Sequence, residues 1–214
     1  MRRACILLLL AAPALLGLAS TGELRELGAN VKSAYDFGLP AWTPAPVEPE
    51  GNPTTDAKVK LGRYLFYDPR LSQDGTMSCE TCHKQALAFT DGRETSLGVT
   101  GAETPRNAMS LANAGYAPVL TWANPLLHTL EQQALVPLIG QEPIELGIAG
   151  MDEEIRQRLL AEPIYAPLFK AAFPEVDGAI SLATITRALG AFQRTLISVR
   201  SPHDRYRYEG DVNA

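Results

Sequence analysis

Two cysteines and one histidine lie within a single pentapeptide, Cys79-Glu80-Thr81-Cys82-His83. In a C-x-x-C-H box of this kind the two thiols can add to the two vinyl groups of a haem, and the adjacent histidine then lies beneath the iron as its axial ligand. The residue types and their spacing therefore predict one covalently attached haem c, held by Cys79, Cys82 and His83.

Three other interpretations of the box stay open. A redox-active dithiol is expected in a βαβ setting, and no segment of the chain has the pattern of parallel strands. A structural zinc site needs four ligands, and the other two histidines, His128 and His203, have no ligand-like neighbours. An exported pair of cysteines could also form a disulfide, but His83 would then be a coincidence. We therefore favour haem attachment.

The amino terminus has the features of a secretory signal. Met1-Arg2-Arg3 is basic, and residues 6–19 form an apolar run that ends in small residues. That run is shorter than the roughly 20 residues that a membrane span needs. We expect residues 1–19 to be a cleaved signal peptide, which would remove Cys5. Export to the periplasm is consistent with haem c, because haem is attached to such boxes after export.

The charge of the chain limits the classes of partner. It has 24 acidic and 19 basic residues in 214, a formal net charge of −5. An acidic protein is not expected to bind nucleic acid or an anionic membrane surface. No further apolar run is long enough to span a bilayer. A hydrophobic content of 46% suits a globular domain.

The rest of the chain predicts an all-α protein with long irregular loops around the haem. We expect a proline-rich extended arm over residues 20–53, a haem domain over 54–206 and a short connector over 207–214. Gly62 and Gly190 lie inside the first and last expected helices, which suits two helices crossing closely beside a haem. Helices are delimited by capping residues or prolines and are expected near residues 55–67, 124–136, 152–162 and 181–196.

Several ordered segments around the haem box match those of one protein family. They are residues 60–72 (KLGRYLFYDPRLS), 78–83 (SCETCH), 88–92 (AFTDG), 104–107 (TPRN), 131–137 (EQQALVP) and 143–147 (PIELG). Over about residues 39–206 the chain resembles the amino-terminal haem domain of bacterial di-haem cytochrome c peroxidases and their MauG-type relatives. Residues 120–125 (LTWANP) and 142–147 (EPIELG) are most similar to the MbnH-like branch, whose best-known member oxidises tryptophan in a partner protein.

This resemblance implies a cytochrome c-like helical domain whose haem reacts with hydrogen peroxide. Glu145 lies where the family has its distal catalytic carboxylate. Such a group takes a proton from one peroxide oxygen and returns it to the other, and burial should raise its pKa. Gln133 matches a glutamine near the distal pocket, and Trp122 matches a tryptophan between the two haems. Asn107 matches an asparagine that binds calcium, an ion that prefers oxygen ligands.

Each of these residues also has an ordinary structural interpretation. Most glutamates are solvated, and Glu142 would replace Glu145 if the alignment shifted by three residues. In the structural interpretation Gln133 is a solvent-facing helix residue, and Trp122 is an aromatic residue of the core or an interface. The family's other calcium ligands lie beyond the end of this chain, so the role of Asn107 depends on residues that are not in it.

Two departures from the family pattern are informative. Some of these peroxidases have a histidine after Ser-Leu-Gly that caps the resting iron, whereas this chain has Val99. Valine cannot coordinate iron, so we expect an open distal side. The remaining candidates for a sixth iron ligand are Met77, Met109, Met151, His128 and His203.

The second departure is that this sequence has no second C-x-x-C-H box. The chain ends about where the family's chain enters its second haem domain, so we expect a truncated product, a fragment or a one-haem protein with a separate partner. We predict a periplasmic oxidoreductase that reduces hydrogen peroxide, with electrons from a small cytochrome, a copper protein or an oxidised partner protein. The alternatives are a one-haem electron-transfer cytochrome and a non-catalytic remnant that dimerises.

Overall fold

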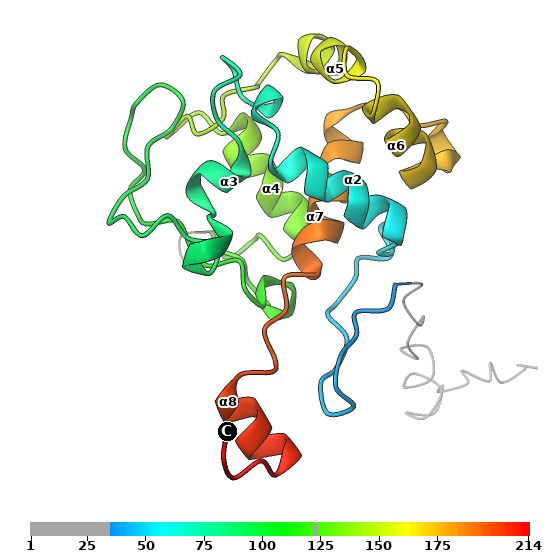
Figure 1. Ribbon diagram of the computed structural model, residues 1–214. Helices are drawn as coiled ribbons and strands as arrows, with labels where there is room; N and C mark the ends of the chain where they lie inside the picture. The colour runs from blue at the N-terminus through cyan, green and yellow to red at the C-terminus, as the bar shows by residue number, and fades with distance from the viewer. Residues whose placement is uncertain (1–34, 122–123) are drawn as a thin grey trace, which may run out of the picture. The chain divides into compact units, whose positions relative to one another are not determined.

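The computed structural model describes residues 35–121 and 124–214, so the expected signal peptide and Trp122 lie outside the described residues. The described chain is built from helices joined by long loops (Figure 1). Within it, only two isolated β-bridges occur. The all-α prediction is therefore confirmed. The helices are α2 (Asp56–Phe66), α3 (Cys79–Cys82), α4 (Leu130–Ile139), α5 (Asp152–Leu160), α6 (Tyr165–Ala172), α7 (Leu182–Arg194) and α8 (Pro202–Asp204).

Helices α2 and α7 cross at the centre of the fold (Figure 1). Both begin at a capping residue close to the predicted start: Thr55 accepts a hydrogen bond from the Lys58 N–H, and Ser181 accepts one from the Thr184 N–H. Their facing surfaces are apolar and almost completely buried. The core residues contributed by these two helices include Leu61, Leu65, Phe66, Ile185, Ala188, Leu189 and Phe192.

The glycine in α2 makes this crossing close, as predicted. A Cβ atom on Gly62 would lie 2.0 Å from the carbonyl oxygen of Ala188. The glycine in α7 has a different neighbour, so that half of the prediction is wrong. A Cβ atom on Gly190 would lie 2.7 Å from a carboxylate oxygen of Glu131 in α4. Gly190 therefore makes room for the ion pair between Glu131 and Arg194.

Helix α4 differs from its prediction at both ends. It begins after Thr129, which caps it by accepting a hydrogen bond from the Gln132 N–H, and not at Asn124-Pro125. Asn124 instead forms a turn in which its side-chain oxygen accepts a hydrogen bond from the Leu126 N–H at 3.0 Å. Helix α4 also continues through Pro137 to Ile139. A proline has no backbone N–H to donate, and the helix ends at Ile139, two residues after Pro137.

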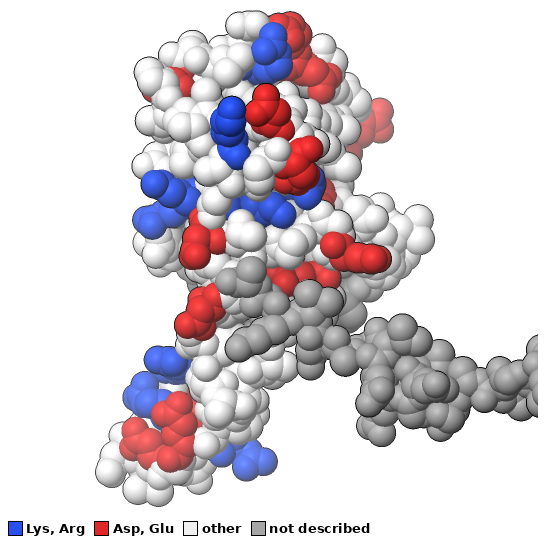
Figure 2. Space-filling view, turned by 90° about the vertical axis from the view of Figure 1, so that its right-hand side faces the viewer, with Lys and Arg blue, Asp and Glu red and all other residues white. Residues whose placement is uncertain are grey.

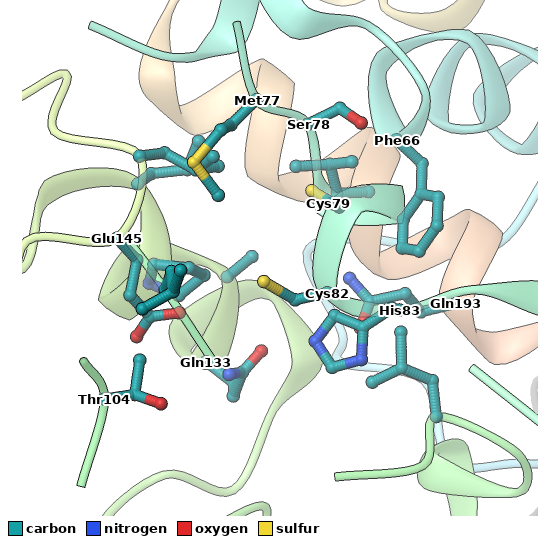
Figure 3. A pocket seen from close by; sticks show the side chains of 17 residues that line it. Phe66, Met77, Ser78, Cys79, Cys82, His83, Thr104, Gln133, Glu145 and Gln193 are labelled. Atoms are coloured by element: carbon teal, nitrogen blue, oxygen red, sulfur yellow. The ribbon is translucent and has the colours of Figure 1, made fainter. Parts of the chain in front are cut away.

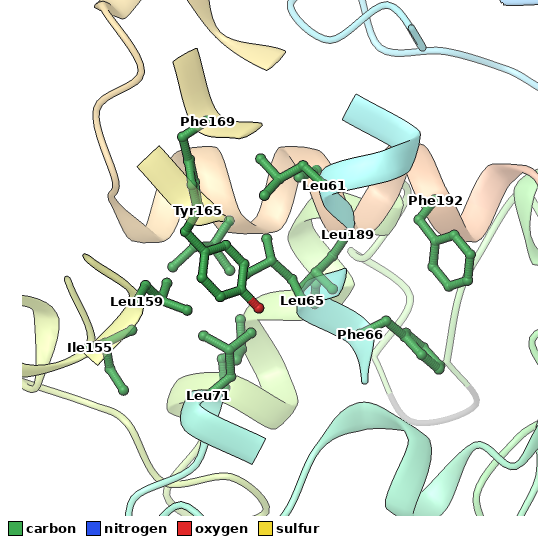
Figure 4. Close-up of a cluster of buried hydrophobic side chains, with 14 of the residues drawn as sticks. Leu61, Leu65, Phe66, Leu71, Ile155, Leu159, Tyr165, Phe169, Leu189 and Phe192 are labelled. Atoms are coloured by element: carbon green, nitrogen blue, oxygen red, sulfur yellow. The ribbon is translucent and has the colours of Figure 1, made fainter. Parts of the chain in front are cut away.

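The same hydrophobic core extends beyond α2 and α7 to further helices (Figure 4). It includes α5, which begins at Asp152 as predicted, and α6, which the sequence analysis did not identify. The Ile164 cap of α6 makes no side-chain hydrogen bond, so α6 has no capping signal. Its stability comes from burial of Tyr165 and Phe169. The Tyr165 hydroxyl donates to the buried carboxylate of Asp68.

The proline-rich arm contains no helix in its described part. Its Trp42 ring stacks on Tyr208 with ring centroids 4.4 Å apart. No described helix combines the length and apolar character that crossing a bilayer would require. Basic and acidic side chains are interspersed over the face shown in Figure 2, which has no uniform basic patch of the kind that binds nucleic acid.

Candidate haem pocket

The haem box lines a pocket enclosed by α2, α3, α4 and α7 (Figure 3). The empty space in it is about 670 Å³, part of which is open to solvent. Much of the wall is apolar and is contributed by Phe66, Leu97, Leu111, Leu138, Leu146 and Leu189.

A single helical turn, α3, places both cysteines on the pocket wall. Its start is fixed by a reciprocal cap, in which the Ser78 N–H donates to the Thr81 hydroxyl at 3.0 Å. Cys79 and Cys82 are separated by three positions, so both sulfur atoms lie on one side of the turn. His83 follows directly and also lines the pocket (Figure 3).

The imidazole of His83 is oriented by the backbone. Its Nδ1 atom lies 2.8 Å from the carbonyl oxygen of Phe89. A carbonyl can only accept, so Nδ1 carries the proton and the Nε2 lone pair is available to a metal. Ala88 and Phe89 adopt positive φ angles of 54° and 61°, and this turn presents the carbonyl to the ring. Burial lowers the pKa of His83, which favours the neutral form that binds iron.

The two thiols are in an environment that does not activate them. Burial raises the pKa of the Cys79 thiol to about 12 and also raises the pKa of Cys82. A redox-active dithiol needs a lowered thiol pKa, so this environment argues against that alternative. Two unpaired thiols, an imidazole whose Nδ1 is held by a backbone carbonyl and an apolar wall together fit a covalently bound haem.

Two of the predicted distal residues lie in the same pocket. Gln133 projects from α4, and Glu145 projects from the loop that follows it (Figure 3). Burial raises the pKa of Glu145, as expected for a carboxylate that moves protons near neutral pH. The rival residue Glu142 is exposed and does not line this pocket. The structure therefore brings Glu145, and not Glu142, together with the haem box.

The remaining predicted residues have different surroundings. The side chain of Asn107 is exposed, and its amide donates to the Ala108 carbonyl at 3.4 Å. Trp122 lies outside the described residues. Of the candidate sixth ligands only Met77 lines the pocket. His128 is exposed, and its Nδ1 lies 2.8 Å from the Pro118 carbonyl oxygen.

One polar residue of the pocket was missed by the sequence analysis. Gln193, on α7, is only 5% exposed and lines the pocket near His83 (Figure 3). Its amide makes no hydrogen bond with any residue that the structure describes. Gln193 follows Leu189 by four positions, so it belongs to the buried stripe of the helix. A lone amide in that stripe is the pattern that could have identified it.

Comparisons with known proteins were consistent with this geometry. The family model described as di-haem cytochrome c peroxidase matches residues 56–213. The chain is 37% identical over 166 residues to the methylamine utilization protein MauG of Methylorubrum extorquens, covering 78% of this chain and 45% of that protein. It is 38% identical over 166 residues to cytochrome c peroxidase Ccp of Escherichia coli, covering 78% of this chain and 34% of that protein.

A solved structure shares more of the sequence. The crystal structure of a MauG-like protein associated with microbial copper homeostasis is 49% identical to this chain and superimposes with a TM-score of 0.81. The match covers 85% of this chain and 52% of that one. The chain thus spans about half the length of this relative, and less than half of the two curated relatives above.

Proposed function

The chain belongs to the di-haem cytochrome c peroxidase family, as its resemblance predicted, and from this we propose that it is a periplasmic haem c oxidoreductase. It reduces hydrogen peroxide, or uses peroxide to oxidise a partner protein. One observation carries the proposal: the acid Glu145, whose pKa is raised by burial, lies in the same pocket as the C-x-x-C-H box.

The haem box holds and orients the cofactor. Cys79 and Cys82 would hold the haem through thioether bonds, and the Nε2 atom of His83 would bind its iron, with the ring fixed by the Phe89 carbonyl. When bound, the haem supplies an iron that exchanges electrons with peroxide. We propose one haem for this part of the chain.

Glu145 moves the proton that the reaction requires. Its carboxylate accepts a proton from one peroxide oxygen and donates it to the other, so that the second oxygen leaves as water. The amide of Gln133 offers a donor and an acceptor to peroxide or to its water. Two electrons and two protons in total convert hydrogen peroxide to two waters.

The electrons come from another protein. Curated relatives include both named peroxidases and MauG, and the 49% identical structure is titled as a MauG-like protein associated with copper homeostasis. We therefore propose a small cytochrome, a copper protein or an oxidisable side chain of a partner protein as the donor. Trp122 as an electron relay and Asn107 as a calcium ligand stay predictions of the family resemblance.

The test is an absorption and EPR study of the full chain, matured with haem in a periplasm. We expect a high-spin ferric haem whose absorption spectrum changes when hydrogen peroxide is added. The Glu145→Gln variant should keep its haem and react about 10²- to 10⁴-fold more slowly. The matched control is Glu142→Gln, because Glu142 is exposed and lies outside the pocket. A six-coordinate low-spin haem that does not respond to peroxide would contradict the proposal.

A one-haem electron-transfer cytochrome is the second candidate, and the position of Met77 favours it. Its thioether lines the pocket, and thioethers are common axial ligands in electron-transfer cytochromes. This candidate predicts a low-spin spectrum that Met77→Leu converts to high spin. The same samples, analysed by size-exclusion chromatography, address the remnant hypothesis, which predicts dimers or aggregates.

A further inference from the structure

The loop of residues 96–104 lies against the segment that carries Glu145. The backbone N–H of Val99 donates a hydrogen bond to the carbonyl oxygen of Glu145 at 2.7 Å. Beside it, a Cβ atom on Gly98 would lie 1.9 Å from the carbonyl oxygen of Ile144 and 3.2 Å from the Cα atom of Glu145. Backbone therefore meets backbone here, and no side chain fits between the two segments.

The loop is held in one shape by its own hydrogen bonds. The Thr104 N–H donates to the Ser96 carbonyl at 2.9 Å, and the Ser96 N–H donates to the Thr104 hydroxyl at 2.9 Å. The Gly98 N–H donates to the Ala102 carbonyl at 2.8 Å. The buried Ser96 hydroxyl also donates to Asp91 at 2.7 Å, which connects the loop to the segment after the haem box.

The side chain of Glu145 has no comparable restraint. Its carboxylate makes no hydrogen bond with any residue of the described ranges. The neighbouring residue is fixed through its backbone: the Leu146 N–H donates to the Pro137 carbonyl at 2.9 Å, and the Leu146 carbonyl accepts from the Gln73 N–H at 2.7 Å. The direction of the carboxylate therefore depends on how the backbone at residue 145 is held.

We propose that Gly98 is a positioning residue for Glu145, and that the 96–104 loop aims the Glu145 carboxylate into the haem pocket. The loop does this through the Val99–Glu145 hydrogen bond, which forms only because residue 98 has no side chain. This inference rests on the proposed function of Glu145. It adds that backbone contact with a separate loop, and not a side-chain partner, sets the position of the acid.

The decisive variant is Gly98→Ala in the haem-loaded full chain. The added methyl group must push the loop away from Ile144, and small displacements of a catalytic group cost up to about 100-fold in rate. We expect the reaction with hydrogen peroxide to slow by about 10- to 100-fold. The pH at which its rate is half-maximal should move toward the pKa of an ordinary glutamate. The matched control is Gly51→Ala, because a Cβ atom there meets nothing within 4 Å.

Hydrogen–deuterium exchange gives a readout that does not depend on activity. The amides of residues 96–104 and 141–148 should exchange faster in Gly98→Ala than in the wild type, with no change in Gly51→Ala. If Gly98→Ala does not accumulate with haem, Thr104→Val replaces it. That variant keeps the side-chain volume but removes the hydroxyl that closes the loop. Because Thr104 also lines the haem pocket, faster exchange of residues 96–104 and 141–148, and not a slower reaction, is its readout.

The outcomes separate this inference from the proposed function. Unchanged rate, pH midpoint and exchange in the loop variants would overturn the positioning role of Gly98. A wild-type protein that does not react with peroxide would overturn the proposed function instead. In that case exchange alone decides: faster exchange in the 141–148 segment of Gly98→Ala supports the loop contact, and unchanged exchange refutes it.

Discussion

Gly62 of α2 and Ala188 of α7 touch through their backbones, with 2.0 Å between the position of a Cβ atom on Gly62 and the carbonyl oxygen of Ala188. This contact lets α2 and α7 form one continuous wall of the haem pocket. Phe66 at the end of α2 contacts Phe192 of α7, with ring centroids 5.2 Å apart. The close approach of the two helices therefore places Phe66 of α2 beside Leu189 and Gln193 of α7 in the lining of the pocket.

Gly62→Ala should destabilise the protein even though alanine is the better helix former. Helix propensity alone would favour alanine by about 1 kcal/mol. The methyl group cannot be accommodated against the Ala188 carbonyl, and overpacking of this kind costs about 1–3 kcal/mol or more. We expect a lower free energy of unfolding in urea. The control Gly51→Ala has open space around it and should stay within about 0.5 kcal/mol of the wild type. A stabilised Gly62→Ala protein would show that the helices are farther apart.

Glu131 and Arg194 form a buried ion pair that joins α4 to α7. The two side chains are 13% and 1% exposed, and Asn52 adds a hydrogen bond to the Glu131 carboxylate at 2.6 Å. Glu131→Gln leaves the Arg194 charge buried without a counterion, which costs about 3–5 kcal/mol. Urea unfolding measures this loss.

The control for that variant is an ion pair on the surface of α5. Glu153 bonds Arg156 at 2.7 Å, and both side chains are exposed. Exposed pairs contribute little, so Glu153→Gln should leave the unfolding midpoint unchanged. Equal effects of the Glu131 and Glu153 substitutions would contradict the view that burial makes the α4–α7 pair important.

Features that depend on local sequence could be predicted. The haem box is a contiguous pentapeptide, and the caps of α2 and α7 are single residues, Thr55 and Ser181, whose side chains bond their own helix. The pairing of Glu145 with this box came from the family resemblance, since the two are far apart in sequence. Only the fold shows that they share one pocket.

Features that depend on tertiary contacts could not be predicted in the same way. A glycine in a helix signals a close neighbour but does not identify it, and Gly190 faces Glu131 instead of α2. Asn124-Pro125 suits a helix start and a turn equally well, and the chain uses it as a turn. Gln193 differs from its apolar neighbours in α7, but only the fold shows that it lines the same pocket as His83.

Tyr208 holds the proline-rich arm through its stack on Trp42, whose ring planes meet at 17°. Aromatic pairs contribute about 0.5–1.5 kcal/mol, so Tyr208→Ala should speed hydrogen–deuterium exchange of residues 38–46 by about 2- to 10-fold. Tyr206→Ala is the matched control, because Tyr206 is 59% exposed and is not in that stack. Equal exchange in both variants would show that the hydrogen bonds from Arg200 to the Gly38 carbonyl at 3.0 Å and from Tyr116 to the Pro44 carbonyl at 2.8 Å hold the arm without the stack.

Ionisation of the Glu145 carboxyl group should lower the free energy of unfolding as the pH rises, in contrast to an ordinary surface acid. Burial raises its pKa in the folded protein, so above about pH 4.3 the unfolded chain releases this proton more readily than the native state. The wild type therefore loses stability as the pH rises from that value through the raised pKa, and changes no further above it.

The Glu145→Gln variant carries no such proton. It should be more stable than the wild type at neutral pH, and the difference in free energy of unfolding should close toward pH 4. Urea unfolding from about pH 4 to 8 measures the gap. The exposed control Glu142→Gln should follow the wild-type curve, and a gap that widened as the pH fell would show that Glu145 is held in its charged form.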